Sequence, residues 1–83
     1  MNWKNRYKKI KSSAELKVGK KYLLKSYVEL KKPNYIMTIL KEVEDGFSIH
    51  FKEINKTYNT TLKYTHSSLN KYLETGAWKI TKL

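Results

Sequence analysis

Few residues in this 83-residue chain could carry chemistry. It contains two histidines, His50 and His66, seven acidic side chains and no cysteine. A thiol nucleophile is therefore excluded, and two histidines so far apart match no recognised spacing of metal ligands. Gly19-Lys20-Lys21 lacks the upstream glycine and the following Ser or Thr of a phosphate-binding loop, and no Gly-x-Ser-x-Gly elbow occurs. The sequence predicts a protein that is not an enzyme, with no catalytic residue, no metal site and no cofactor.

Positive charge is the property that departs most from an average protein. The 18 Lys and Arg side chains against seven Asp and Glu give a formal net charge of +11. Residues 1–32 hold 11 of these basic side chains and only Glu15 and Glu29 as acids, so this part carries +9. A potential concentrated in one part of a small domain attracts polyanions. Nucleic acid is the first partner this predicts, and an acidic surface on a host protein is the second.

The kind of base limits what the charge could do. All the basic residues except Arg6 are lysines, and asparagine is also abundant. An AT-rich genome gives this composition without selection for binding, so solvated charge with no function stays an open alternative. Arginine is the usual bidentate reader of guanine, whereas lysine acts as a point charge. Nucleic-acid binding, where present, is expected to have little sequence specificity.

The elements that must position these lysines are expected to be mainly strands. Four residues at helical spacing predict a basic N-terminal arm over residues 1–15, which is either a short helix or ordered only on binding: Trp3, Tyr7, Ile10 and Ala14. From Lys20 the apolar period changes to two, which predicts a first strand that continues to Leu30. Residues 35–43 are apolar on both faces and read as a central strand. Asp45-Gly46 predicts a tight hairpin, because glycine accepts the positive φ of the turn.

The second half of the chain predicts two further strands around a helix. After the hairpin, three residues are expected to point inward and three outward: Phe47, Ile49 and Phe51, then Ser48, His50 and Lys52. A fourth strand is expected over 58–64. A short helix follows, capped by Thr65 or Ser67 and ended by Gly76. The last strand is expected over 78–83 with Trp78 and Ile80 inward.

The C-terminal part also carries a resemblance. The segment Leu69-Asn70-Lys71-Tyr72-Leu73-Glu74-Thr75-Gly76-Ala77-Trp78-Lys79-Ile80 resembles the ending of many small phage-encoded barrel proteins. In those proteins a helix carrying Leu and Tyr runs through Gly into a Trp-bearing strand. Five short strands with a helical turn before the last one are similar to an SH3-like barrel. The resemblance implies a fold and a viral accessory origin, and it implies no catalytic residue.

The predicted fold is α+β and mainly β. We expect a five-stranded antiparallel SH3-like barrel or bent sheet in a single domain over 1–83, with residues 16–83 as the barrel core. The predicted binding site joins the arm to outward strand positions: Lys4, Arg6, Lys8, Lys9, Lys11, Lys21, Lys25, Tyr27, Lys52 and Lys63. Lysines for phosphate and an aromatic ring for base stacking are the pairing that single-strand binders use. The alternative for Tyr27 is an edge-strand ring packed under the N-terminal helix.

The sequence also bounds location and assembly. No run approaches the roughly 18 apolar residues of a membrane span, and the start lacks the apolar run of a signal peptide. We expect no membrane span and a cytoplasmic location, in the host cell if the protein is viral. A core this small leaves a homodimer open. The main hypothesis is a nucleic-acid-binding module, and the alternative is a phage accessory protein that inhibits a host defence or regulatory protein by protein–protein interaction. Binding to a membrane surface through the arm is third.

Overall fold

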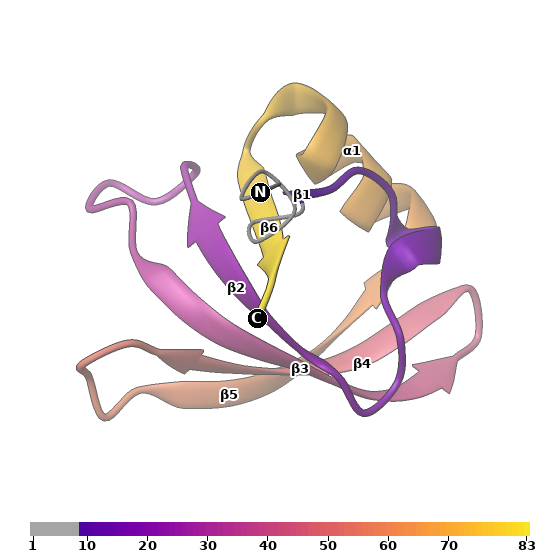
Figure 1. Ribbon diagram of the computed structural model, residues 1–83, viewed down its shortest axis with the longest axis horizontal. Helices are drawn as coiled ribbons and strands as arrows, with labels where there is room; N and C mark the ends of the chain where they lie inside the picture. Colours follow the sequence, from indigo (N-terminus) through magenta and orange to yellow (C-terminus); the bar gives the residue numbers. More distant parts are fainter. Residues whose placement is uncertain (1–8) are drawn as a thin grey trace, which may run out of the picture.

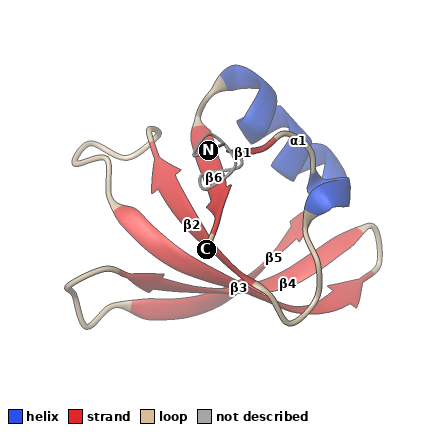
Figure 2. Ribbon diagram, viewed as in Figure 1, coloured by secondary structure: helices blue, strands red, loops and turns tan. Residues whose placement is uncertain are grey.

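Six antiparallel strands form one sheet in the computed structural model, which describes residues 9–83 (Figure 1). They are β1 (Lys9–Ile10), β2 (Lys21–Ser26), β3 (Asn34–Val43), β4 (Gly46–Glu53), β5 (Asn59–Thr65) and β6 (Trp78–Lys82). A 3₁₀ turn, η2 (Ser13–Glu15), precedes β2, and the helix α1 (His66–Thr75) connects β5 to β6 (Figure 2). The sheet order is β1-β6-β2-β3-β4-β5. The fold is mainly β with one helix before the last strand, as predicted.

The sheet bends so that its two ends approach each other. In the sheet order β2, β3 and β4 separate β6 from β5, yet Trp78 of β6 and Tyr64 of β5 pack with ring centroids 5.1 Å apart. The helix α1 contacts both β5 and β6, and Leu69 on its inner side is fully buried. The concave face of the sheet and one side of α1 therefore enclose the core.

The prediction of five strands is wrong, and of the two predicted architectures, a barrel or a bent sheet, the structure has the bent sheet. The structure has six strands in an open sheet, because the short strand β1 adds to the outer edge of β6. At the other end, β5 pairs with β4 and forms no second ladder among the described strands. Side chains and α1 fill the space where a closing ladder would lie. They fill it only in part. An opening onto the aromatic side chains of the core remains between β5 and the loop that follows β2.

The core follows the alternation of the strands. Inward positions are nearly inaccessible on β2 (Tyr22, Leu24), β3 (Tyr35, Met37, Ile39), β4 (Phe47, Ile49, Phe51) and β6 (Trp78, Ile80). These positions confirm the inward sets predicted for the third and last strands. Ser48 was predicted to point outward and is nevertheless buried. It is a short residue that lies in register between Lys41 and Lys63, whose longer side chains flank it.

The β3–β4 hairpin is confirmed, although its glycine works differently from the prediction. Asp45, not Gly46, takes the positive φ of the turn, at 59°. Gly46 pairs with Val43 and Thr65, and its Cα lies against the backbone of β5. An added Cβ would collide with the carbonyl oxygen of Tyr64 and lie 2.7 Å from Cα of Thr65. The position thus requires glycine for close packing of three strands.

Gly46→Ala should therefore destabilise the protein. Because the obstacle is backbone rather than a movable side chain, β5 would have to shift, and overpacking of this kind costs about 1 to 3 kcal/mol. Urea unfolding followed by circular dichroism measures the loss. Gly19→Ala is a control that tests backbone strain without a steric clash. Gly19 has φ 85°, but no atom lies within 4 Å of an added Cβ. A Gly46→Ala protein with unchanged stability would contradict the close packing.

The first strand is shorter than predicted. β2 ends at Ser26, and Val28 and Leu30 are 60% and 98% exposed instead of inward. The chain turns back toward β3 here: the amide of Ser26 donates to the carbonyl of Pro33, and a turn closes from the amide of Lys32 to the carbonyl of Glu29. Residues 27–33 therefore form a loop over the mouth of the opening. The alternation of apolar residues in the sequence continues past Ser26, although the residues after Ser26 do not belong to the strand.

The central strand is confirmed, with one irregularity. β3 lies between β2 and β4, and its register with β4 shifts between Ile39 and Lys41. A bulge leaves its extra residue unpaired, and Leu40 is accordingly 45% exposed rather than packed on a second apolar face. The other face of this strand is thus only partly covered.

The N-terminal region joins the sheet within the described residues. Ile10 lies in the core and pairs with Ile80, and the carboxylate of Glu15 accepts from the amides of Lys11 and Ser12. The helix predicted from the spacing of Trp3 to Ala14 is therefore wrong for residues 9–14. Its first part lies outside the described residues.

The C-terminal helix confirms its predicted signals. Thr65 is the N-cap, with its hydroxyl accepting from the amide of Ser68, and Gly76 ends the helix in the left-handed conformation at φ 77°. Tyr72 and Leu73 pack against the core beside Leu69. The helix thereby places Tyr72 against Trp78, with the two rings stacked 4.6 Å apart.

Candidate functional site

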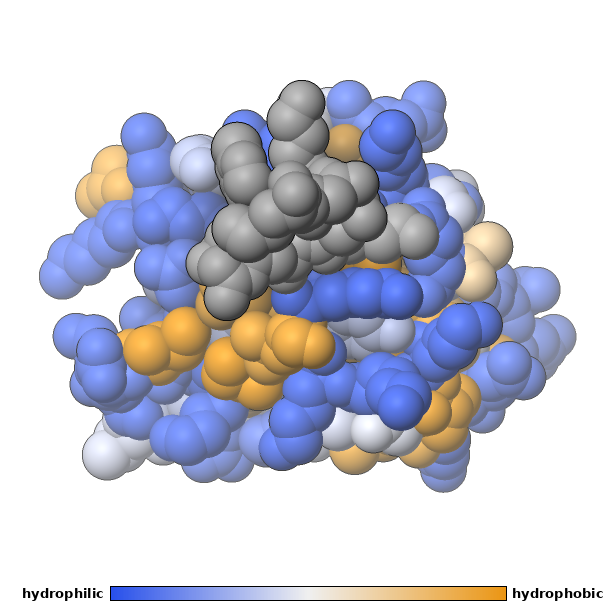
Figure 3. All heavy atoms as spheres, in the orientation of Figure 1, coloured by the Kyte–Doolittle hydropathy of each residue, from blue (hydrophilic) through white to orange (hydrophobic). Residues whose placement is uncertain are grey.

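A basic surface covers the outer side of the sheet. Alternation and register place seven lysines on the side opposite the core, from all six strands: Lys9, Lys21, Lys25, Lys41, Lys52, Lys63 and Lys79. We call this set the basic face. Hydrophilic side chains also dominate the surface in Figure 3, with apolar side chains in small patches between them. The structure thus brings together five of the predicted site residues: Lys9, Lys21, Lys25, Lys52 and Lys63.

The basic face has an unbalanced charge. None of the described strand residues that alternate onto it is acidic. Lys25 of β2 lies directly opposite Lys79 of β6 in the register. Like charges directly opposite each other on neighbouring strands are unfavourable. An arrangement of this kind becomes favourable when an anion bridges the two side chains.

Tyr27 lies at the edge of the basic face. It belongs to the loop after β2 rather than to the strand, and its side chain is 41% exposed. The ammonium groups of Lys79 and Lys32 lie 5.4 and 5.9 Å from its ring centroid. The two cations hold the ring by cation–π attraction while part of it stays open to solvent. The predicted combination of lysines with an exposed aromatic ring is therefore present.

A second group of lysines continues the basic face at the start of β2. Lys17, Lys20, Lys21 and Lys82 line a hollow of about 220 Å³ together with Tyr22 and Leu83. The backbone amide of Lys17 donates to the hydroxyl of Tyr22, which fixes this turn against the sheet. Of the remaining predicted residues, Lys11 is exposed between β1 and η2. Lys4, Arg6 and Lys8 lie outside the described residues.

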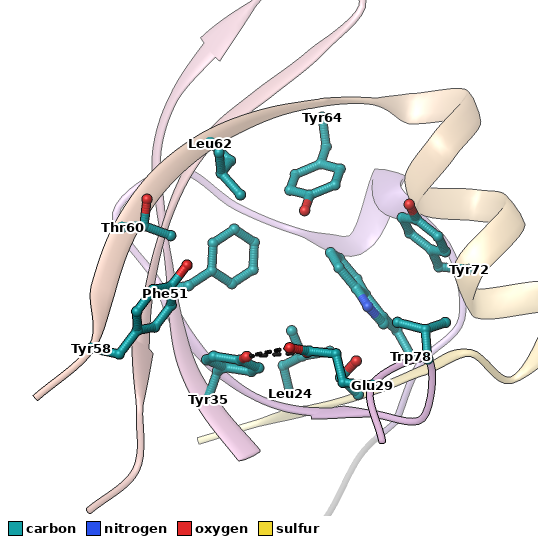
Figure 4. Close-up of a pocket in the computed structure, with 12 residues that line it drawn as sticks. Leu24, Glu29, Tyr35, Phe51, Tyr58, Thr60, Leu62, Tyr64, Tyr72 and Trp78 are labelled. Carbon is teal, nitrogen blue, oxygen red and sulfur yellow. Dashed lines mark hydrogen bonds between the residues drawn. The ribbon is translucent and has the colours of Figure 1, made fainter. Parts of the chain in front are cut away.

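An aromatic groove opens on the concave side of the sheet, and the sequence did not predict it. Its volume is about 220 Å³. Six aromatic side chains line it: Tyr35, Phe51, Tyr58, Tyr64, Tyr72 and Trp78. Figure 4 shows Phe51, Tyr64 and Trp78 packed side by side along one wall, with Tyr58 and Tyr35 at one end and Glu29 beside Tyr35. We call this site the aromatic groove.

The walls of the aromatic groove are fixed by ring-to-ring packing. Phe51 meets Tyr35, Tyr64 and Trp78 edge to face, with centroids 5.7 to 6.1 Å apart. Phe51, Tyr35 and Trp78 are buried, whereas Tyr58 is 51% exposed. Edge-to-face packing at these distances is favourable. The inner wall is therefore pre-formed, and Tyr58 is its exposed member.

Two of the polar groups that line the aromatic groove bear on its chemistry. The hydroxyl of Tyr35 donates to both carboxylate oxygens of Glu29 at 3.1 Å. Burial and then the hydrogen bond to Glu29 raise the pKa of Tyr35 to about 12. The second group is the hydroxyl of Ser26, which is 1% exposed and has no hydrogen-bond partner among residues 9–83. Buried polar groups without partners are rare in folded proteins.

The sequence signals for the aromatic groove were ambiguous. The sequence pattern indicates that Phe51, Tyr72 and Trp78 are core residues. They do pack in the core, and they also line the groove. Glu29 read as an outward residue of a continuing strand, whereas it lies in the loop over the opening. One usable signal was the number of tyrosines, seven in 83 residues, of which the described core fully buries only Tyr22 and Tyr35.

The histidines form no metal site with the acidic residues. His66 shares a hydrogen bond of 2.9 Å between its Nδ1 and the Ser13 hydroxyl, and its ring packs edge-on against Phe47. Within residues 9–83 no group of three or more His, Cys, Asp or Glu side chains is placed to hold a metal ion. In the same part of the chain, no helix is long and apolar enough to cross a membrane.

Comparison of the chain with family models, curated proteins and solved structures finds no match. The resemblance to small phage-encoded barrels therefore stays a prediction. Function has to be argued from the two surfaces themselves.

Proposed function

We propose that this protein is a non-enzymatic binding module whose basic face holds the phosphate backbone of nucleic acid with little sequence specificity. The observation that carries the proposal is the set of seven lysines on the outer side of one sheet, with no acid among the described strand residues of that side. Lysines distributed over a surface bind the regular charge of a polyanion, and each contact releases counterions.

The proposed mode of binding combines charge and stacking. Each lysine acts as a point charge toward a phosphate and reads no base edge, because it lacks the planar fork of arginine. Tyr27 offers a partly exposed ring next to Lys79 and Lys32, where an unpaired base could stack. Phosphate contacts therefore set the affinity, and the ring favours single strands over duplex.

The test is fluorescence anisotropy with labelled single- and double-stranded oligonucleotides of several sequences, across a salt series. We expect similar affinity for different sequences and a log affinity that falls by about 0.7 to 0.9 per phosphate contact for each tenfold rise in salt. No binding even at low salt would reject the proposal. The basic face would then be assigned to an acidic surface on another protein, which is the alternative predicted from the sequence.

Tyr27→Ala should separate stacking from charge. Stacked bases contribute about 1 to 3 kcal/mol each, so the substitution should weaken single-strand binding by roughly 5- to 150-fold and duplex binding much less. Tyr58→Ala is the matched control, because Tyr58 is similarly exposed but lines the aromatic groove on the other side of the sheet. Equal losses on single strand and duplex for Tyr27→Ala would exclude stacking.

A further inference from the structure

We propose that the aromatic groove is a binding site for an organic cation that carries a trimethylammonium group. The site is separate from the basic face: its lining residues include none of the seven lysines of that face. It unites six aromatic rings, the carboxylate of Glu29 and the unpartnered hydroxyl of Ser26. These three observations point to the same ligand chemistry.

The first step is the local charge. In a chain with a net charge of +11, the lining of the aromatic groove within residues 9–83 contains one acidic residue, Glu29, and no basic residue. The carboxylate of Glu53 lies close enough to act on Tyr35 as well. A phosphate group in the groove would meet these carboxylates, so the chemistry of the basic face does not extend into it. A cation is the charged ligand that the groove favours.

The second step is the aromatic wall. The face of an aromatic ring attracts a cation, most strongly when the cation gives up little hydration on entering. A trimethylammonium group meets this condition, because its charge is spread over methyl groups that also gain from apolar contact. An unmodified ammonium group is compact and strongly hydrated, so it suits this wall poorly. The pre-formed packing of Phe51, Tyr64 and Trp78 means that little ordering is needed on binding.

The third step is the placement of the polar groups. Tyr35 donates to both oxygens of Glu29, which holds the carboxylate at the rim, where it can face a cation on the rings. Ser26 lines the same groove with a buried hydroxyl that no group in the described part of the chain satisfies. A hydroxyl or carbonyl attached to the cation could complete that hydrogen bond once the side chains that cover Ser26 shift aside. The long-range repulsion from the lysines is screened beyond about 8 Å at physiological salt.

The test uses choline chloride and its neutral isostere 3,3-dimethylbutan-1-ol, titrated at 0.15 M salt while the NMR signals of the Trp78 indole and the groove tyrosines are followed. The two probes have the same shape and differ in charge. We expect choline to bind at least tenfold more tightly and to shift the signals of the aromatic groove rather than those of Tyr27. Equal affinity for the two probes, or no saturable shift with choline, would overturn the proposal.

Two variants locate the site without threatening the core. Glu29→Gln should weaken choline binding about tenfold and leave the isostere unchanged, because it removes charge and keeps shape. Tyr58→Ala should weaken both probes, because it removes part of the wall. If both variants bind choline as tightly as the wild type, the cation binds elsewhere and the assignment is overturned. Thermal melting of both variants confirms that they remain folded.

A final arm distinguishes the sources of the group. Trimethyllysine, with its ends blocked, is compared with choline and with unmethylated lysine blocked in the same way. Preference for trimethyllysine indicates a modified protein side chain, and preference for choline indicates a free small cation; both support the trimethylammonium site. Equal binding of methylated and unmethylated lysine would reject it. Neither result bears on nucleic-acid binding, which is measured with separate residues and probes.

Discussion

Trp78→Ala is expected to lower the free energy of unfolding by about 3 to 5 kcal/mol. This loss is enough to unfold a domain of marginal stability. Trp78 is only 6% exposed, stacks on Tyr72 and meets Phe51 and Tyr64 edge to face. It therefore joins β6 to β4, β5 and α1 at once. The substitution removes the ring that packs the two ends of the bent sheet against each other. The surrounding rings could not all move in to fill the space.

Urea unfolding, followed by far-ultraviolet circular dichroism, measures this loss. Tyr58→Ala is the matched control, because Tyr58 lines the same groove but is 51% exposed. It should cost about 1 kcal/mol or less, as expected for a half-exposed side chain. Similar unfolding midpoints for wild type and Trp78→Ala would show that Trp78 contributes to the groove and not to the core.

Local signals in the sequence predicted most of the elements correctly. The hairpin at Asp45, the helix caps at Thr65 and Gly76 and the inward phase of β4 depend on residues within a few positions of each other. Such features follow from backbone sterics and from hydrogen bonds inside one segment. The structure therefore agrees with the sequence wherever the cause is local.

The errors come from interactions between distant segments. Lys9–Ile10 becomes a strand because β6 offers it an edge, and the helical spacing around Ile10 contains no information about that edge. The first strand stops at Ser26, whose partner Trp78 is the first residue of β6, and the apolar pattern up to Leu30 contains no information about where that distant partner strand begins. The barrel stays open for the same reason: closure depends on how β5 and β6 meet around Trp78, and no local pattern encodes this.

The two candidate surfaces differ in the same way. Lysines at outward phases of strands were predictable, because alternation places them on one side of any sheet that buries Tyr22, Met37 and Ile49. The aromatic groove was not predictable, since it requires Ser26 at the end of β2 and Glu29 in the loop after it to meet Tyr58 from the β4–β5 connection. A ring that belongs to the core and also to a site gives the sequence signature of a core residue.

Replacing Lys21 and Lys25 together by Glu is expected to weaken nucleic-acid binding by roughly 30- to 160-fold, or about 2 to 3 kcal/mol. Each change removes an attraction to phosphate and adds a repulsion, and both residues lie on β2 near the middle of the basic face. The loss should be equal for all sequences. The slope of log affinity against log salt should also become shallower by about 1.4 to 1.8, because two phosphate contacts are lost.

The matched control is Lys56→Glu with Lys71→Glu, which makes the same change in net charge, from +11 to +7, since each substitution lowers the charge by two. Lys56 lies in the β4–β5 connection and Lys71 on α1, so neither belongs to the basic face. If binding depends on the face, the control pair should lose less than tenfold in affinity and keep most of its salt slope. Equal losses for the two pairs would show that overall charge attracts nucleic acid, and the seven outward lysines would then have no particular role in binding.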